Sequence, residues 1–217
     1  MILALAQTKG GVGKTTLAVN LAVERATRGR RDVLLVDADD QATATDFAAL
    51  RSETKGGAIG YTSIQLSGAA VRSQVLALKP KYDDIIIDVG GRDTTALRAA
   101  LTVAQVAVVP FQPRSFDVWT IDKVAALISE ARTINPDLRA VAVINCADPQ
   151  GADNDAAAEA LGDNAAISFL GAPIGRRKAF PNAAAAGLSV LELAHPDYKA
   201  SNELRVLADH LFDGVWE

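Results

Sequence analysis

Ile2-Leu-Ala-Leu-Ala6, followed directly by Gln7-Thr-Lys-Gly-Gly-Val-Gly-Lys-Thr-Thr16, is the stretch of this 217-residue sequence that decides its fold. A short apolar run that breaks into glycines and Lys-Thr-Thr is typical of a strand that leads through a phosphate-binding loop into a helix. Glycines let backbone N–H groups point at phosphate oxygens, and the helix N-terminus adds a positive dipole. In this pattern Lys14 reaches the β- and γ-phosphates and Thr15 ligates Mg²⁺. The sequence therefore predicts a nucleoside triphosphate site.

Two later apolar runs end in acidic residues. The run 32–36 leads to Asp37-Ala-Asp-Asp-Gln41, and the run 84–87 leads to Asp88 and then Val89-Gly-Gly-Arg-Asp93. In an open parallel sheet the carboxyl ends of the strands face the ligand crevice. Asp88 is therefore the expected Walker B carboxylate of a Mg²⁺ shell, and Gly91 has the spacing for its N–H to bond a γ-phosphate.

Helix capping is an alternative role for some of these aspartates. One of the three in 37–40 is expected to cap a helix at 43–50, with Asp40 as the candidate, and Asp93 to cap a helix at 94–103. Both roles can occur together.

The loop at 9–16 departs from the ordinary G-x-x-x-x-G-K-[ST] pattern, because Thr8 replaces the first glycine and Lys9 is additional. It resembles the deviant Walker A box of the ParA/MinD family of ATPases, and most closely the short plasmid-partition ParA (ParF-like) type. In that family the additional lysine reaches across a dimer interface to phosphates held by the other subunit. The resemblance implies that Lys9 couples nucleotide binding to dimerisation; a solvated loop lysine is the plainer alternative.

The resemblance also implies ATP and Mg²⁺ as cofactors. Asp39 would position the attacking water, Asp37 would organise the outer shell of the magnesium, and Asn145 would read the adenine edge, unless it only satisfies backbone groups at a turn. The family usually has proline where this chain has Asp40. The implied catalytic residues are Lys9, Lys14 and Asp39; the nucleotide-binding residues are Lys9, Gly10, Gly11, Val12, Gly13, Lys14, Thr15, Thr16, Gly91 and Asn145; the metal-binding residues are Thr15, Asp37 and Asp88.

Alternating apolar strands and helices predict an α/β fold, a doubly wound, mostly parallel sheet flanked by helices, of the P-loop NTPase type. No repeat or low-complexity linker divides the chain, so we expect one domain over residues 1–217. The single cysteine, Cys146, excludes an internal disulfide framework. The N-terminal apolar run is too short for a signal peptide or membrane span, and Leu204, Leu207, Ala208 and Leu211 form a core-facing stripe rather than a membrane anchor. We expect a cytoplasmic protein without membrane binding.

The net charge of −4 gives no global field that attracts nucleic acid, so DNA binding would need a local patch. Arg176, Arg177 and Lys178 form the only tight basic cluster, and a DNA or partner contact and a solvated helix start are equally good interpretations. Arg114 is an interface candidate by resemblance, with a solvated arginine as an equally good interpretation. It lies in a loop where Ser115 or Asp117 would cap the next helix.

The resemblance implies a partition ATPase that forms a homodimer with ATP, binds DNA non-specifically and associates with the nucleoid in that state. A ParB/ParG-like centromere-binding protein or a cargo adaptor would stimulate its slow hydrolysis. Alternatives are a positioning ATPase for carboxysomes or other cargo, and a metabolic ligase of the dethiobiotin-synthetase type. The nitrogenase iron protein type fails because it needs two cysteines per subunit, and a bacterial tyrosine kinase would need a C-terminal tyrosine cluster where only Tyr198 is found.

Overall fold

The computed structural model describes residues 1–113, 118–148, 154, 158–159 and 164–214. Its strands are β1 (Ile2–Leu5), β2 (Val33–Ala38), β3 (Thr62–Gln65), β4 (Asp84–Val89), β5 (Val106–Phe111), β6 (Arg139–Ala147), β7 (Ser168–Phe169) and β8 (Ile174–Gly175). Its helices are α1 (Lys14–Thr27), α2 (Thr43–Thr54), α3 (Ala70–Leu78), α4 (Thr95–Leu101), α5 (Val118–Arg132), α7 (Ala179–Ala185) and α8 (Tyr198–Ala208). Short 3₁₀ turns lie at Lys79–Lys81 and Val190–Glu192, and a π-helical turn at Asp209–Asp213 follows α8.

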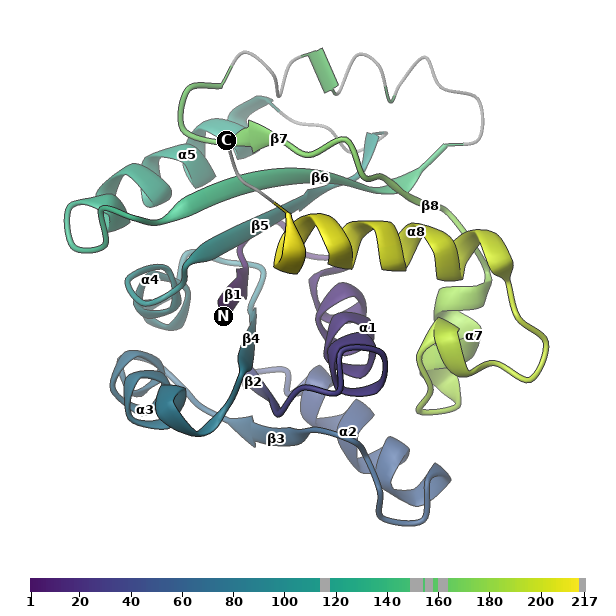
Figure 1. Ribbon diagram of the computed structural model, residues 1–217. Coiled ribbons are helices and arrows are strands. Elements are labelled where there is room, and N and C mark those ends of the chain that lie inside the picture. Colours follow the sequence, from purple (N-terminus) through teal and green to yellow (C-terminus); the bar gives the residue numbers. More distant parts are fainter. Residues whose placement is uncertain (114–117, 149–153, 155–157, 160–163, 215–217) are drawn as a thin grey trace.

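The strands form one sheet in the order β3-β2-β4-β1-β5-β6-β7, with β8 paired to the end of β6, and every described pair is parallel. Parallel neighbours require crossover helices, which cover both faces of the sheet (Figure 1). The expected α/β fold with a doubly wound parallel sheet is confirmed. Because β1 lies in the middle of the sheet, its loop is flanked by the ends of β4 and β5.

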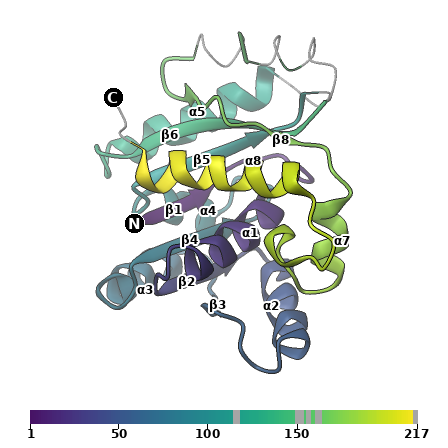
Figure 2. The same ribbon diagram turned by 45° about the vertical axis from the view of Figure 1, so that its right-hand side comes forward.

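The core consists of two apolar layers, one on each face of the sheet. Ile2 and Ala4 of β1 pack on one side with α3, α4 and α5, whereas Leu3 and Leu5 pack on the other with α1, α2, α7 and α8. Figure 2 shows the second set of helices from a turned view. Successive strand residues point to opposite faces, so a strand buried on both sides must be apolar throughout. The helix face of Leu204, Leu207, Ala208 and Leu211 is fully buried, as predicted.

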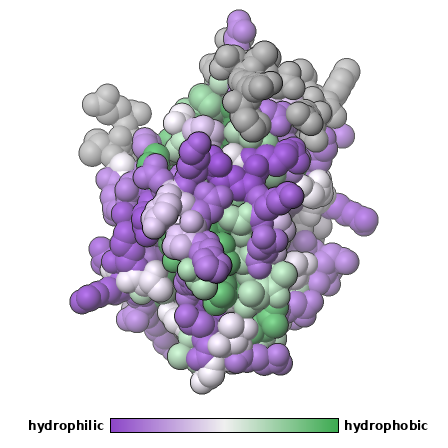
Figure 3. Space-filling model, turned by 90° about the vertical axis from the view of Figure 1, so that its right-hand side faces the viewer, coloured by the Kyte–Doolittle hydropathy of each residue, from purple (hydrophilic) through white to green (hydrophobic). Residues whose placement is uncertain are grey.

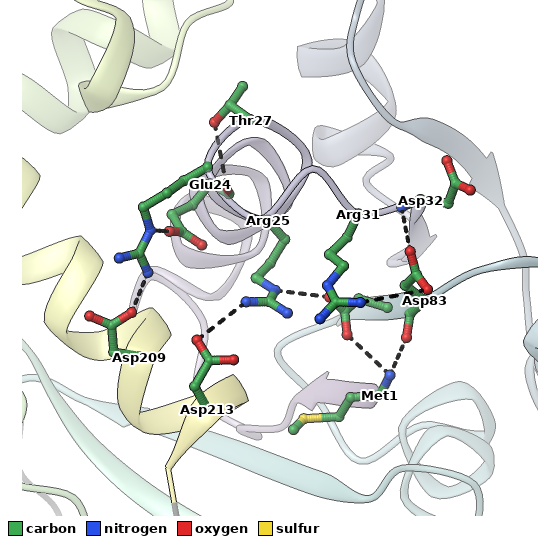
Figure 4. Close-up of polar contacts among 11 residues, drawn as sticks. Met1, Glu24, Arg25, Thr27, Arg31, Asp32, Asp83, Asp209 and Asp213 are labelled. Carbon is green, nitrogen blue, oxygen red and sulfur yellow. Dashed lines mark hydrogen bonds and ion pairs between the residues drawn. The ribbon is translucent and has the colours of Figure 1, made fainter.

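A network of ion pairs closes the end of the sheet that is remote from the phosphate loop. Arg25 of α1 donates through Nε to Asp84 of β4 at 2.8 Å, and the terminal amine of Met1 pairs with the same carboxylate at 3.1 Å. The Arg25 guanidinium also lies 4.4 Å from the ring centroid of Phe212. Its Nη1 lies 3.6 Å from the Asp213 carboxylate, as Figure 4 shows. This network holds the turn after α8 against the C-terminal end of α1.

A second set of buried polar contacts lies behind α1. Asn20 donates to the Thr16 carbonyl at 2.8 Å and accepts from the Ser189 hydroxyl and the Val190 N–H. Glu192 forms a capping box with Ser189, and its carboxylate accepts hydrogen bonds from both terminal nitrogens of Arg51. The Arg51 side chain is only 2% exposed. The segment 187–192 therefore links the N-terminal half of α1 to α2.

The surface over α7 and the adjacent end of α8 is largely hydrophilic with a smaller apolar area (Figure 3). Scattered apolar surface is normal for folded proteins and marks no docking site by itself. Among the described residues, none of the helices combines the length and the hydropathy that crossing a bilayer requires.

Candidate nucleotide-binding site

The loop between β1 and α1 has the backbone shape that a phosphate requires. Gly11 and Gly13 adopt positive φ values of 75° and 91°, conformations that side chains disfavour, and α1 begins at Lys14. The Lys14 side chain is buried, and its Nζ donates to the Lys9 carbonyl oxygen at 3.1 Å. Burial lowers the pKa of Lys14, while Asp88 and Asp39 raise it in part. An ammonium group thus lies at the floor of the loop, where phosphate oxygens would replace water.

Three amide side chains hold this loop from outside. Asn145 of β6 donates to the Val12 carbonyl at 2.7 Å, Gln112 donates to the Gly11 carbonyl at 2.8 Å, and Gln7 accepts from the Thr8 N–H at 2.8 Å. A Cβ on Gly13 would lie 2.1 Å from Nδ2 of Asn145, so only glycine fits there. Turning carbonyls outward leaves the N–H groups free to face a ligand. Gln7 and Gln112 were not among the site residues predicted from the sequence, although each is a polar residue that follows the carboxyl end of a strand, β1 and β5 respectively.

Asn145 lies within β6 rather than closing it, because the strand continues to Ala147 through Cys146 at a positive φ of 55°. The backbone-satisfying role left open for Asn145 is observed. Its contact with adenine stays a prediction.

Asp88 is the buried carboxylate of the site. It is directly opposite Leu5 of β1 and Asp37 of β2 in the sheet register, so residues far apart in sequence meet at one level. Among the described residues, neither of its oxygens has a partner in hydrogen-bonding geometry. Burial raises the pKa of Asp88 to about 7, with Asp37 adding to the rise; the nearby Thr15 hydroxyl and Lys14 counteract it.

A divalent cation fits this carboxylate. A buried charge without a partner is costly, and a hard cation with oxygen ligands would compensate it. Thr15 and Asp88 would hold Mg²⁺, which supplies charge neutralisation at phosphate oxygens. In the described part of the chain no three His, Cys, Asp or Glu residues gather into a metal cluster.

The aspartates at the end of β2 differ from the prediction in which of them contacts the start of α2. Asp37 accepts from both the N–H and the hydroxyl of Thr45, at 2.8 Å each, and so anchors the start of α2. The prediction that Asp40 caps this helix is wrong, because Ala42, in a left-handed conformation, precedes Thr43 and turns the chain so that Asp37 receives the helix N–H. Asp39 stays at the site, where its Oδ1 accepts from the Gln41 N–H at 3.1 Å.

The loop after β4 lies tightly against the other two segments. A Cβ on Gly91 would lie 2.8 Å from the Cα of Gly10, and one on Gly90 would lie 3.2 Å from Oδ1 of Asp39. The helix α4 is capped by Thr94, whose hydroxyl accepts from Leu97 N–H at 3.1 Å. The prediction that Asp93 caps this helix is therefore wrong. Asp93 pairs with Arg98 instead, and this contact lowers the pKa of Asp93.

These segments enclose an open pocket of about 860 Å³, a size suited to a nucleotide. It is lined by the phosphate loop, the loop after β2, Gly68 and the loop after β4. The predicted residues that line it are Gly10, Gly11, Gly13, Lys14, Thr15, Thr16, Asp39 and Gly91.

The basic cluster is not a set of three unpaired cations. Arg177 forms a two-pronged ion pair with Glu203 of α8, and Glu203 also accepts from the Gly175 N–H at 3.0 Å. Arg176 lies 3.9 Å from Asp148, while Lys178 is exposed at the start of α7. Arg114, Ser115 and Asp117 lie outside the described residues.

The fold and the site define a P-loop nucleotide-binding protein: a parallel sheet whose central strand delivers Gly-Lys-Thr to a helix N-terminus, beside an acidic strand end. Residues 3–190 match the sequence family described as the CobQ/CobB/MinD/ParA nucleotide binding domain. The chain belongs to this family, as its phosphate loop predicted.

Individual relatives show how far the likeness extends. "Maintenance of carboxysome distribution protein A" of Halothiobacillus neapolitanus is 28% identical over 96% of this chain and 95% of its own length. The "Chromosome-partitioning ATPase Soj" of Thermus thermophilus is 30% identical over 65% of this chain and 67% of its own. These named relatives span both carboxysome distribution and chromosome partitioning.

Solved structures agree on the fold. Apo McdA from Cyanothece superposes with a TM-score of 0.80 at 18% identity, covering 97% of this chain and 98% of that one. Cobyrinic acid a,c-diamide synthase from Mycobacterium smegmatis, with bound ATP analog and magnesium, has a TM-score of 0.78 at 22% identity, covering 99% and 96%. At this identity the likeness establishes the fold alone.

Proposed function

We propose that this chain is a ParA-type positioning ATPase that binds ATP with Mg²⁺, dimerises in the ATP-bound state, and hydrolyses ATP slowly. The observation that carries the proposal is the buried carboxylate of Asp88, without a hydrogen-bond partner among the described residues, beside Thr15 and the phosphate-loop lysine. The family and its named partition and distribution relatives support the same class.

The proposal assigns a role to the predicted residues in and beside the pocket. Lys14 and the loop N–H groups bind the phosphates, Thr15 and Asp88 hold the cation, and Asp37 orients its outer shell. Asp39, at the pocket wall, orients the attacking water as general base. Gly91 donates its N–H to the γ-phosphate, so that loss of this phosphate releases the loop after β4.

Lys9 links this chemistry to assembly. It follows the buried Gln7 on the loop, and its carbonyl receives the Lys14 ammonium in the isolated chain. In the proposal its side chain crosses to the phosphates of a second copy, which makes the dimer dependent on ATP. The dimer binds DNA non-specifically and so associates with the nucleoid, and a ParB/ParG-like or cargo-adaptor partner stimulates hydrolysis.

Cargo is the part of the proposal on which the relatives differ. The likeness to a carboxysome distribution protein over almost the whole of both chains favours protein-assembly cargo as a second candidate beside plasmid or chromosomal DNA. A metabolic ligase of the dethiobiotin-synthetase type shares the same fold and is the contrasting alternative.

Co-sedimentation with DNA in the presence of ATP, ADP or no nucleotide tests the class. The expected result is DNA binding with ATP and Mg²⁺ only, weakening steeply as salt rises. DNA binding that is absent in every nucleotide state would contradict the partition proposal and favour the metabolic alternative.

A further inference from the structure

Arg92 is a cation of the pocket to which the sequence motifs assign no role. It is exposed and lies on the wall of the pocket, in the loop that joins β4 to α4. We propose that Arg92 contacts the γ-phosphate of bound ATP and makes the site prefer ATP over ADP. This inference rests on the proposed ATP site, and its test is separate from the test of that site.

The charges around Arg92 favour a ligand contact. In the part of the chain that the structure describes, Arg92 has no ion pair, whereas its neighbour Asp93 is bound by the Arg98 guanidinium at 2.8 Å through two nitrogens. Arg98 also donates to Glu130 at 2.5 Å. Asp93, the nearest carboxylate in sequence, is thus paired with Arg98, and the positive charge of Arg92 stays available to the pocket.

The loop that carries Arg92 is fixed at both ends. Gly91 touches the backbone of Gly10 so closely that a Cβ would clash at 2.8 Å, and Thr94 caps α4 through Leu97 N–H. Only two residues, Arg92 and Asp93, therefore separate the backbone contact to the phosphate loop from the cap. The backbone of Arg92 is therefore fixed at the pocket rim, from which its exposed side chain can reach a bound anion.

The position along the site points to the γ-phosphate. The loop begins just after Asp88, the carboxylate that would hold the cation. Arg92 directly follows Gly91, whose N–H is proposed to bond the γ-phosphate. Among the described lining residues the acidic side chains are Asp39 and Asp40, which repel a triphosphate, and the basic ones are Lys14 and Arg92. Lys14 is buried in the phosphate loop, whereas Arg92 is the exposed cation of the lining. A guanidinium suits this contact because it donates two parallel hydrogen bonds to phosphate oxygens.

The test compares ATP and ADP affinities, each with Mg²⁺, by calorimetry on the wild type, Arg92→Ala and Arg92→Lys. We expect Arg92→Ala to bind ATP about tenfold more weakly and ADP within about twofold of the wild type, because only ATP has the contacted group. Arg92→Lys should recover part of the ATP affinity. The matched control is Arg72→Ala, an exposed arginine on α3 that donates to the Thr102 carbonyl and should leave both affinities unchanged.

Retained ADP binding shows that a variant is folded and that the nucleotide site is intact, so failure of this inference is distinct from failure of the proposed site. Equal losses for ATP and ADP, an unchanged ATP affinity in Arg92→Ala, or a lysine variant as weak as alanine would each overturn the γ-phosphate contact.

A second variant tests the charge argument. Arg98→Ala releases Asp93, which can then pair with Arg92 and reduce ATP affinity several-fold while ADP binding is unchanged. Adding Asp93→Asn to Arg98→Ala should restore ATP affinity. Failure of Asp93→Asn to restore it would contradict the view that Arg98 keeps Arg92 available.

Discussion

Gly91 and Gly10, which are 81 positions apart in sequence, lie in backbone contact: a Cβ on Gly91 would sit 2.8 Å from the Cα and 2.9 Å from the N of Gly10. The loop after the Walker B strand and the phosphate loop are therefore packed against each other, with no room for a side chain at Gly91. This contact gives a physical route from the γ-phosphate to α4.

Gly91→Ala should weaken ATP binding at least about tenfold, because the added methyl group must displace the phosphate-loop backbone. Fluorescent-nucleotide titration measures the effect. Gly171→Ala is the control, since a Cβ there meets no atom within 4 Å. ATP affinity equal to wild type in Gly91→Ala would show that the two loops are not coupled.

Lys14→Ala should lower ATP affinity by about a hundredfold or more, because the buried ammonium at the floor of the loop is removed. Equilibrium binding by calorimetry with Mg²⁺ checks this. An unchanged dissociation constant would remove the phosphate-loop assignment itself.

Asp39→Ala should slow hydrolysis about a hundredfold while ATP still binds, since the carboxylate at the pocket wall is proposed to orient water rather than hold the nucleotide. Phosphate release under single-turnover conditions is the measurement. Normal hydrolysis in this variant would move the water-positioning role to another residue.

The sequence predicted the fold and the main parts of the site because these depend on local patterns. Continuous apolar runs marked the strands, and Asp37 and Asp88 were placed together because both end parallel strands, as the register of β2 and β4 confirms. Contacts between distant side chains and backbone were not predictable in the same way. Gln112 reaches Gly11 across about a hundred residues, and no periodicity encodes such a contact.

The prediction of the α2 cap was wrong because the conformation of a single residue changes how the helix begins. Ala42 adopts a left-handed conformation, which a non-glycine residue rarely does, and this turn moves the cap of α2 from Asp40 to Asp37. The pairing of Arg177 with Glu203 was hidden because it joins the segment after β8 to α8. Of the three cations at 176–178, Arg177 is thus held in an ion pair that supports the fold.

Arg177→Ala should reduce the free energy of unfolding by about 0.5–1 kcal/mol, because Glu203 loses a half-buried ion pair. Lys178→Ala should leave stability unchanged and, if this surface contacts DNA, lessen the salt dependence of DNA binding. Chemical denaturation and DNA titration at several salt concentrations separate the two effects. Equal stability of the two variants would contradict the structural role of Arg177.

Stability at acid pH should depend on Glu192. Burial raises its pKa, but the hydrogen bonds from Arg51, Ser189 and Lys55 outweigh this, and the pKa falls to about 2 from an ordinary 4.5. A lowered carboxyl pKa stabilises the fold above pH 4.5, and this contribution is lost as pH falls from 4.5 towards 2. It amounts to at most about 3 kcal/mol and is reduced by partial exposure to solvent.

Glu192→Gln should therefore be less stable than wild type at pH 7 and should show a flatter loss of stability between pH 4.5 and 2. Urea denaturation at a series of pH values measures both curves. Parallel curves for the two proteins would rule out this carboxylate as a source of acid sensitivity.

The most direct test of ATP-controlled assembly is the solution mass of wild type and Lys9→Ala by light scattering, with Mg²⁺ and either ATP or ADP. We predict that wild type has twice the mass of one chain with ATP and the mass of one chain with ADP, and that Lys9→Ala has the mass of one chain with both. A wild-type mass that is the same with ATP and ADP, or a Lys9→Ala variant that dimerises with ATP as wild type does, would contradict the proposal.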